Sequence, residues 1–324
     1  MKTTAVAPSN IALIKYWGKK DEKLRLPANG SISVNLSNLT TTTTVEFRKD
    51  LKKDEVIING KRDEKKAERV MKHLDRIRKK AKISDYARVV SQNNFPTAGG
   101  LASSASGFAA LTVAATKAAG LNLSEKELSI LARQGSGSAC RSIPDGFVEW
   151  LDGETSETSH ALSLYPPSYW DLAIVVVLAG GEEKSVLTTE GMKRLDTNPF
   201  YPIRLSRINE KIKKMKQYLS GKKFEEFGSL VESEALELHA MTLTSSPPII
   251  YWRPKTIKVM KLVQKIRENN VPVYFTIDSG PHVCIICEEK HLKKLLQMLK
   301  RQRIKDFIVN KPTIGARLVD GHLF

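Results

Sequence analysis

The chain has 324 residues and carries 52 Lys and Arg against 35 Asp and Glu, which gives a formal charge of +17 at pH 7. Its length predicts two domains at roughly 100–200 residues each, and its 41% hydrophobic content excludes a disordered, collagenous or low-complexity chain. No apolar run approaches the roughly 18–20 residues of a membrane span, and Pro8, Ser9 and Asn10 interrupt any signal-like segment, so we expect a soluble cytoplasmic protein.

The first half of the sequence alternates segments of strand periodicity with segments of helix periodicity. In chain order we expect strands at 3–6, 31–36, 41–47 and 56–58, a helix at 65–80, a strand at 88–92, an apolar helix reaching residue 119, a helix from residue 124 and a strand at 146–150. Asn59-Gly60 is typical of a hairpin turn after the fourth strand. Ser124 and Glu127 have the spacing of a capping box, which marks a helix start.

The second half has the same mixture and follows a polar, proline-containing stretch at 153–169. Its expected elements are a strand at 172–178, helices at 201–219, 224–242 and 255–269, strands at 273–277 and 283–287, a basic helix and a closing strand. We therefore place a boundary near Trp170 and predict one domain over 1–170 and a second over 171–324. The mixture of strands and helices in both halves indicates two packed α+β domains.

The basic excess gathers in short runs that we interpret as the solvated faces of helices. Most of these runs fall within patterns whose apolar residues recur every three or four positions. They lie at 49–53, 76–82, 211–216 and 293–305. Aromatic residues make up only 7% of the chain, and no nucleic-acid-binding motif accompanies the charge. The excess suits a polyanionic small substrate instead, because a positive cleft raises the rate of encounter with such a molecule.

Two of the three cysteines, Cys284 and Cys287, form a C-x-x-C pattern that is found in redox and metal sites. Here the pattern lies inside an apolar segment that we predict to be a strand. Residues three apart on a strand point to opposite faces, and no second Cys/His cluster completes a zinc site. We therefore expect two separate core thiols, with Cys140 as the third free cysteine.

A Gly/Ser-rich segment at 93–107 has the composition of an anion cradle. Gly99 and Gly100 allow the backbone to approach a ligand, while Ser103 and Ser104 supply hydroxyls at the start of a predicted helix. The segment is not a Walker loop, because it lacks G-x-x-x-x-G-K-[S/T]. A simple turn before a buried helix would explain the same composition equally well.

Two further segments carry groups that bind anions. Lys15 and Lys19 lie within 9–19 beside two aromatic residues and are able to neutralise phosphates. The segment 136–141 offers two serine hydroxyls and Arg141, whose planar fork matches a carboxylate.

These segments resemble a known family. Pro96-x-x-x-Gly100-Leu-Ala-Ser-Ser-Ala105 is similar to the phosphate loop of the GHMP small-molecule kinases. Within that superfamily, the segments 10–19 and 135–142 and the turn Asp278-Ser-Gly-Pro281 resemble the mevalonate diphosphate decarboxylases, with further matches at Gly191-Met192 and His239-Ala240. The resemblance implies a GHMP kinase fold, in which a domain like domain 2 of ribosomal protein S5 packs on a ferredoxin-like domain.

The resemblance also implies a reaction. Mg-ATP would phosphorylate the 3-hydroxyl of mevalonate 5-diphosphate, and loss of phosphate and CO2 would then give isopentenyl diphosphate for isoprenoid biosynthesis. A homodimer is a further expectation from the family.

Site roles follow by position in the matched motifs. Asp278 would orient and deprotonate the 3-hydroxyl, Lys15 would stabilise the developing charge, and Arg141 would hold the substrate carboxylate. The expected diphosphate-binding residues are Tyr16, Lys19, Ser136 and Ser138. The expected ATP-binding residues are Pro96, Gly99, Gly100, Leu101, Ala102, Ser103 and Ser104, with Ser104 also facing the magnesium indirectly. Asn10 and Trp17 would shape the substrate pocket.

The sequence departs from the family pattern at two positions, since Asp145 stands where a glycine is usual and His282 where an asparagine is usual. The first-domain helix normally supplies an arginine near the nucleotide, for which Arg76 and Arg78 are the candidates.

Three alternative functions stay open. One is a mevalonate 3-kinase, which the joint presence of Lys15, Arg141 and Asp278 disfavours; the second is a phosphomevalonate decarboxylase, whose substrate differs by one phosphoryl group. A basic nucleic-acid-binding protein on an S5-like fold is a more distant alternative that rests on the charge alone.

Overall fold

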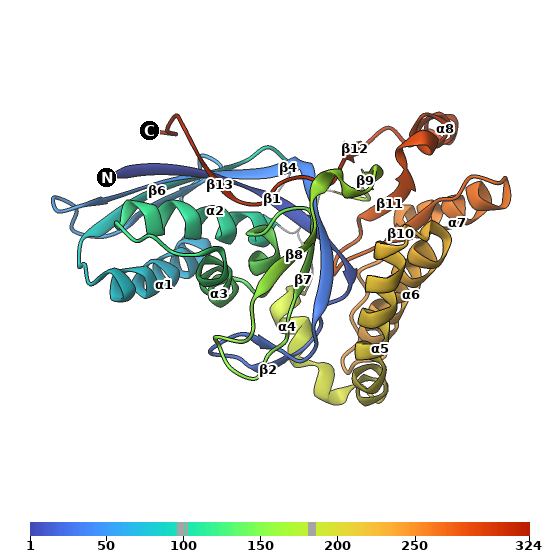
Figure 1. Cartoon of the computed structure of the whole chain (residues 1–324), viewed down its shortest axis with the longest axis horizontal. Helices are drawn as coiled ribbons and strands as arrows, with labels where there is room; N and C mark the ends of the chain where they lie inside the picture. Colours follow the sequence, from blue (N-terminus) through green and yellow to red (C-terminus); the bar gives the residue numbers. More distant parts are fainter. Residues whose placement is uncertain (96–100, 102, 181–185) are drawn as a thin grey trace.

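The computed structural model describes residues 1–95, 101, 103–180 and 186–324. Within these ranges the first half of the chain is built on a seven-stranded sheet (Figure 1), with the order β13-β1-β4-β6-β5 and with β7 and β8 branching from β4. The strands are β1 (Lys2–Ile14), β4 (Ser31–Arg48), β5 (Glu55–Ile58), β6 (Tyr86–Asn93), β7 (Phe147–Trp150), β8 (Ala161–Tyr165) and β13 (Arg317–Val319). A separate ribbon pairs β2 (Lys19–Asp21) with β3 (Leu26–Pro27).

Helices α1 (Glu64–Ala81), α2 (Ser103–Ala118) and α3 (Glu125–Gly135) bury their apolar sides against this sheet in one continuous core. The predicted capping box is confirmed at α3, where Ser124 and Glu127 satisfy each other's backbone N–H groups. A short 3-10 helix, η1 (Gly137–Ser142), follows α3 directly and turns the chain toward β7.

The second half contains a four-stranded antiparallel sheet in the order β10-β11-β9-β12. Its strands are β9 (Leu172–Val177), β10 (Tyr274–Thr276), β11 (Val283–Glu288) and β12 (Phe307–Asn310). Its helices are α4 (Thr188–Lys193), α5 (Tyr201–Ser220), α6 (Phe224–Leu243), α7 (Pro254–Glu268) and α8 (Glu289–Arg301), and single 3-10 turns lie at η2 (Pro167–Tyr169) and η3 (Leu195–Thr197).

Strand β9 is apolar throughout because both of its faces are buried. Leu172, Ile174 and Val176 join a core that includes α5, α6 and strands of the first sheet. The alternate residues, Ala173 and Val175 among them, face α7 and α8. Strand periodicity therefore divides one run of hydrophobic residues between two layers.

The C-x-x-C thiols are separated as predicted. Cys284 belongs to the core shared with the first sheet, whereas Cys287 belongs to the core under α7 and α8. Both are buried and free, and they lie on opposite faces of β11, as the strand periodicity predicts.

Two details of the first sheet differ from the sequence prediction. The expected strands at 31–36 and 41–47 are one strand, β4, because a register shift opposite Pro8 and Ser9 absorbs the polar residues between them. The turn at Asn59-Gly60 closes only one bridge, Ile58 to Lys61, while β5 pairs in parallel with β6 at the sheet edge.

The end of the chain returns to the first sheet, where β13 pairs antiparallel with β1 and the two termini lie close together in Figure 1. The division into domains near residue 170 stays a prediction.

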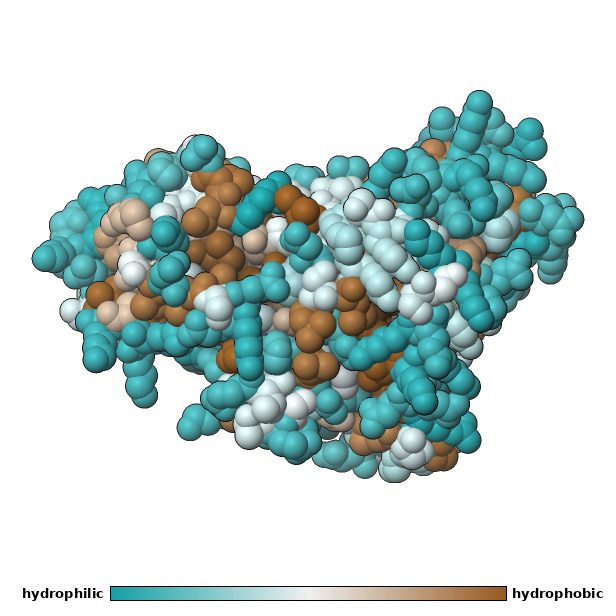
Figure 2. All heavy atoms as spheres, viewed as in Figure 1, coloured by the Kyte–Doolittle hydropathy of each residue, from teal (hydrophilic) through white to brown (hydrophobic). Residues whose placement is uncertain are grey.

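Three of the four basic runs lie on solvated helix faces, as predicted, whereas the run at 49–53 lies in the turn between β4 and β5. On α8, Leu295 and Leu299 are buried while Lys293, Lys294 and Lys300 are exposed. Figure 2 shows hydrophilic side chains covering this end of the molecule. In the ranges that the structure describes, none of the helices combines the length and apolarity that a membrane crossing requires.

Candidate active site

A cavity of about 650 Å³ opens between the end of β1, η1, the start of α1, the start of α2 and the segment after β10. It gathers side chains from both halves of the chain. Its described lining includes seven Lys and Arg side chains against two Asp side chains: Lys15, Lys19, Arg25, Lys65, Lys66, Arg69 and Arg141 against Asp63 and Asp278. The balance of charge in the cavity favours an anionic ligand.

Lys15 and Asp278 form an ion pair at the wall of this cavity, with 2.6 Å between the lysine Nζ and the carboxylate Oδ1. The ammonium also donates to Thr276 Oγ1 at 2.6 Å and to the Ala12 carbonyl at 2.8 Å, so its three hydrogens are all used. The Lys15 side chain is only 1% exposed, whereas that of Asp278 is 25% exposed. The carboxylate therefore faces the ligand space while the lysine supplies a buried positive charge behind it.

Arg141 lies on η1 and is buried, with a guanidinium held by neutral groups. Nη1 donates to Ser31 Oγ at 2.7 Å and Nη2 donates to Asn10 Oδ1 at 3.2 Å. In the described part of the chain, no carboxylate lies within ion-pair distance of this guanidinium, and burial lowers its pKa. A buried cation without an anion is costly, so this side chain is suited to binding a carboxylate on a ligand.

The residues expected at the diphosphate surround the same part of the cavity. Ser136, Ser138, Tyr16 and Lys19 all line it. Burial raises the pKa of Tyr16, so its phenol stays protonated and able to donate a hydrogen bond. Lys19 also pairs with exposed Glu22 at 2.7 Å.

Gly137 explains how Tyr16 comes so near to η1. A Cβ at this position would lie 2.9 Å from Tyr16 Cε1 and 3.1 Å from Trp150 Cη2. The tyrosine ring itself packs on Trp150 with 4.6 Å between the ring centroids. Only glycine allows this approach.

Part of the expected ATP loop is described. Ser103 and Ser104 line the cavity at the start of α2, and Ser136 Oγ lies 3.4 Å from Ser104 Oγ. Ser9 Oγ donates to the Leu101 carbonyl at 2.9 Å, which ties this segment to β1. The predictions for Pro96, Gly99, Gly100 and Ala102 lie outside the described residues.

The candidate arginines on α1 are not in the cavity. Arg78 pairs with Asp54 and Asp75, and Arg76 donates to the Lys72 carbonyl at 3.2 Å. Arg69 lines the cavity instead, with its guanidinium 5.1 Å from the centre of the Phe108 ring.

The two departures from the family pattern have structural roles outside the cavity lining. Asp145 Oδ1 accepts the Gly315 N–H at 2.6 Å, which ties the loop before β7 to the C-terminal segment. His282 Nδ1 accepts the Ala179 N–H at 3.0 Å and thereby joins the ends of two strands.

Sequence reasoning missed one residue that holds the site together, and it gave a second, Asn10, only a role in shaping the pocket. Thr276 binds the Lys15 ammonium, and its position two residues before Asp278 places both on one side of an extended segment. Asn10 accepts from Arg141 and donates to Ser142 Oγ at 2.8 Å. Strand periodicity was a usable signal for Thr276, but no local pattern connects Asn10 with Arg141.

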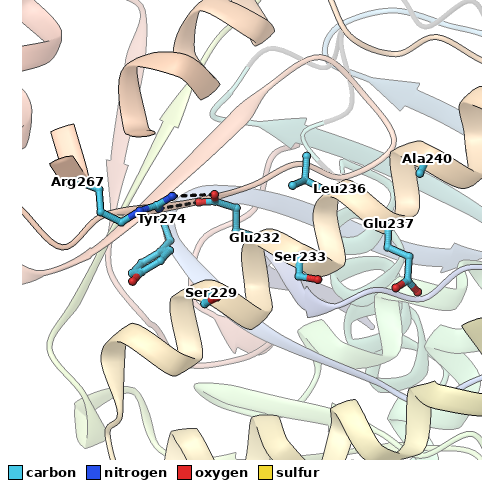
Figure 3. A pocket seen from close by; sticks show the side chains of 8 residues that line it. All are labelled: Ser229, Glu232, Ser233, Leu236, Glu237, Ala240, Arg267 and Tyr274. Atoms are coloured by element: carbon cyan, nitrogen blue, oxygen red, sulfur yellow. Dashed lines mark hydrogen bonds and ion pairs between the residues drawn. The ribbon is translucent and has the colours of Figure 1, made fainter. Parts of the chain in front are cut away.

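A second hollow of about 600 Å³ lies on the outer side of α6 (Figure 3). In the figure Glu232 points toward Arg267, and the two side chains pair at 2.9 Å. Glu237 pairs with Arg204 and Lys211. Because both carboxylates have cation partners, this hollow offers less to a charged ligand than the larger cavity does.

Family models match both halves of the chain. Residues 7–161 match the diphosphomevalonate decarboxylase-like N-terminal domain, and residues 173–313 match the mevalonate 5-diphosphate decarboxylase C-terminal domain.

Individual relatives agree with these models. Diphosphomevalonate decarboxylase of Debaryomyces hansenii is 37% identical over 318 residues, which cover 92% of this chain and 82% of that protein. The human diphosphomevalonate decarboxylase is 36% identical over 305 residues, which cover 87% of this chain and 76% of that protein.

Solved structures show the same fold. Mevalonate diphosphate decarboxylase from Staphylococcus aureus matches with a TM-score of 0.94, 40% identity and 98% coverage of both chains. The Enterococcus faecalis enzyme matches with a TM-score of 0.93, 39% identity and 99% coverage of both chains. The predicted α+β GHMP kinase fold is thereby confirmed, and the chain belongs to the diphosphomevalonate decarboxylase family.

Proposed function

We propose that this cavity carries out the ATP-dependent decarboxylation of mevalonate 5-diphosphate to isopentenyl diphosphate, with ADP, phosphate and CO2 as the other products. The observation that carries the proposal is the joint placement of the Lys15–Asp278 pair and the Arg141 guanidinium in one cavity. The reaction needs a base for a hydroxyl and a fixed carboxylate, and these residues supply both.

Asp278 orients the 3-hydroxyl and accepts its proton. Its carboxylate is anchored through Oδ1 by Lys15 while the side chain is partly open to the cavity. Because the Lys15 ammonium donates all its hydrogens within the protein, it acts through its charge, which stabilises the negative charge that develops on the reacting oxygen.

Arg141 binds the substrate carboxylate and fixes the bond that breaks when CO2 leaves. Ser31 and Asn10 hold two corners of the guanidinium and thereby set its orientation. Tyr16, Lys19, Ser136 and Ser138 bind the diphosphate, and their position near Arg141 supports a substrate with an anionic group at each end.

The residues at the start of α1 and α2 suit a magnesium nucleotide. Lys65, Lys66 and Arg69 supply positive charge, and Ser103 and Ser104 stand at the N-terminus of α2, where the backbone N–H groups point out of the helix. The described residues hold no cluster of three His, Cys, Asp or Glu for a metal, which fits Mg²⁺ held mainly by phosphate oxygens and water. A solved relative was determined with MVAPP, AMPPCP and magnesium. When bound, Mg-ATP supplies the phosphoryl group that makes the 3-oxygen a leaving group.

The test is a product balance. The purified protein is incubated with Mg-ATP and either mevalonate 5-diphosphate or mevalonate 5-phosphate, and ADP, phosphate and CO2 are measured in the same reaction. We expect one CO2 per ADP with the diphosphate and far slower turnover with the monophosphate. Formation of ADP and a stable 3-phosphate without CO2 would identify a kinase, and preference for the monophosphate would correct the substrate.

Ser104→Ala is expected to raise the KM for Mg-ATP and to lower kcat, because the hydroxyl faces the nucleotide phosphates in this proposal. Loss of a hydrogen bond to a charged group is worth about 1.5–3 kcal/mol, or roughly 10- to 150-fold in kcat/KM for ATP. Steady-state kinetics over a range of Mg-ATP measure it. Ser220→Ala, on the surface end of α5, is the matched control. Unchanged kinetics in Ser104→Ala would remove this hydroxyl from the site.

Raising the ionic strength is expected to lower kcat/KM for mevalonate 5-diphosphate more than kcat. The cationic lining attracts the anionic substrate, and salt screens this attraction. The screening length is about 8 Å at physiological ionic strength and shortens as salt is added. A salt series with a neutral osmolyte as control measures this effect. An RNA complex that competes with the substrate would contradict the assignment of the charge to a small molecule.

A cytoplasmic location and a homodimer are further parts of the proposal, and the family resemblance is their support. Light scattering on the purified protein measures the oligomeric state.

A further inference from the structure

Two buried charged side chains from the C-terminal half bind the backbone of Lys15. The Lys15 N–H donates to Glu234 Oε2 at 3.0 Å, and Arg204 Nη2 donates to the Lys15 carbonyl at 3.0 Å. Both peptide groups of this residue are therefore bound by charge-assisted hydrogen bonds that come from α5 and α6.

The pair itself is fully enclosed. The side chains of Arg204 and Glu234 are 1% and 0% exposed and lie 3.0 Å apart. Burial raises the pKa of Glu234, but Arg204 and Lys211 outweigh it and lower the pKa to about 2, so the carboxylate is ionised at neutral pH.

A buried ion pair is a poor source of stability, because the cost of removing two charges from water offsets their attraction. Apolar side chains of similar size would often serve the core equally well. The two charges must therefore be accounted for by what they bind. Besides Lys211 and Glu237, which are themselves charged, they bind the backbone N–H and carbonyl of Lys15.

Helix α6 also holds the strand that leads to Asp278. Glu232 Oε2 accepts the Phe275 N–H at 3.3 Å while pairing with Arg267 (Figure 3). The next residue of that strand, Thr276, accepts from the Lys15 ammonium. One helix thus binds both the backbone of the lysine and the strand that carries its partner.

We propose that Glu234 and Arg204 are positioning residues, which fix the Lys15 backbone from the C-terminal half and so hold the lysine ammonium against Asp278. This inference rests on the roles proposed above for Lys15 and Asp278.

Glu237 provides a matched control. Glu237 and Glu234 both pair with the cations Arg204 and Lys211. Unlike Glu234, Glu237 makes no hydrogen bond to the backbone of Lys15. In the wild type, both carboxylate oxygens of Glu234 accept hydrogen bonds. Glutamine has only one acceptor oxygen, so in Glu234→Gln the NH2 group must face either the cations or the Lys15 N–H. Glu237→Gln makes the same change of charge without touching Lys15.

We expect Glu234→Gln to lower kcat by about 10- to 100-fold with KM values for both substrates close to wild type, because a misplaced reacting group costs rate rather than affinity. Glu237→Gln should keep kcat near wild type. Thermal unfolding of each variant gives the stability against which the kinetics are compared. Equal loss of kcat in both variants, or loss only in proportion to the unfolded fraction, would overturn the proposal.

Arg204→Lys is the second variant, needed if Glu234→Gln does not fold. Lysine keeps the charge but lacks the fork that reaches the Lys15 carbonyl and both carboxylates together, so the same fall in kcat is expected. A folded Arg204→Lys protein with wild-type kcat would overturn the positioning role.

Lys15→Met separates this inference from the proposed function. An active Lys15→Met protein would refute the role of Lys15 itself. An inactive Lys15→Met protein, combined with a fully active Glu234→Gln protein, would refute only the positioning by Glu234.

Discussion

Replacing Asp278 with asparagine is expected to lower kcat by about 10²- to 10⁴-fold, the usual contribution of a general base. The amide is unable to take the hydroxyl proton, and its loss of charge leaves the buried Lys15 ammonium without its ion-pair partner. The nucleotide-binding residues are untouched, so the affinity for a non-hydrolysable ATP analogue should stay near that of the wild type. Release of CO2 and ADP, with calorimetric titration of the analogue, measures both effects.

Asp145→Asn is the matched control for this change. Asp145 is exposed and binds the Gly315 N–H outside the cavity, so the same substitution there should leave turnover near wild type. A folded Asp278→Asn protein that keeps wild-type turnover would show that Asp278 only shapes the turn after β10.

The local structure around the site was predictable because its signals are local. Alternation and β-branching marked the strands, and the capping box at Ser124 gave the start of α3. The same periodicity placed Cys284 and Cys287 in different cores. These signals depend only on residues within a few positions of one another.

The contact between Lys15 and Asp278 was not predictable from local signals. They are 263 positions apart, and only the resemblance to a family, not any spacing in the chain, connected them. The same limit applies to Glu234, which sequence reasoning did not select. An acidic residue on a helix is usually solvated, and its burial against Lys15 follows from how α6 packs on the end of β1.

The arginines of α1 show a limit of helical periodicity. Arg69 and Arg76 are seven positions apart and lie on nearly the same side of the helix. The cavity, however, lies at the N-terminal end of α1, where Asp63, Lys65 and Lys66 also line it. Periodicity fixes a face of a helix but not which end meets the ligand, so the prediction chose arginines too far along the chain.

Arg141→Lys is expected to lower kcat for decarboxylation by about 100-fold, a loss typical of a reacting group displaced by about 1 Å. Arginine here binds Ser31 and Asn10 through its two terminal nitrogens and still has N–H groups for a carboxylate. Lysine keeps the charge, but its single ammonium is unable to hold both neutral partners and bind a carboxylate through two parallel hydrogen bonds. The carboxylate would then rotate relative to the bond that must break.

The nucleotide should be unaffected by this change, because Arg141 lies on η1, whereas Lys65, Lys66 and Arg69 belong to α1. The KM for ATP should therefore stay near wild type while the KM for mevalonate 5-diphosphate rises. Arg76→Lys, outside the cavity on α1, makes the same substitution and should change neither constant. ADP and CO2 measured together show where the defect lies: a burst of ADP without CO2 places Arg141 in the carbon–carbon cleavage, and equal slowing of both places it before phosphoryl transfer. Wild-type rates for both products in Arg141→Lys would remove the guanidinium from the carboxylate altogether.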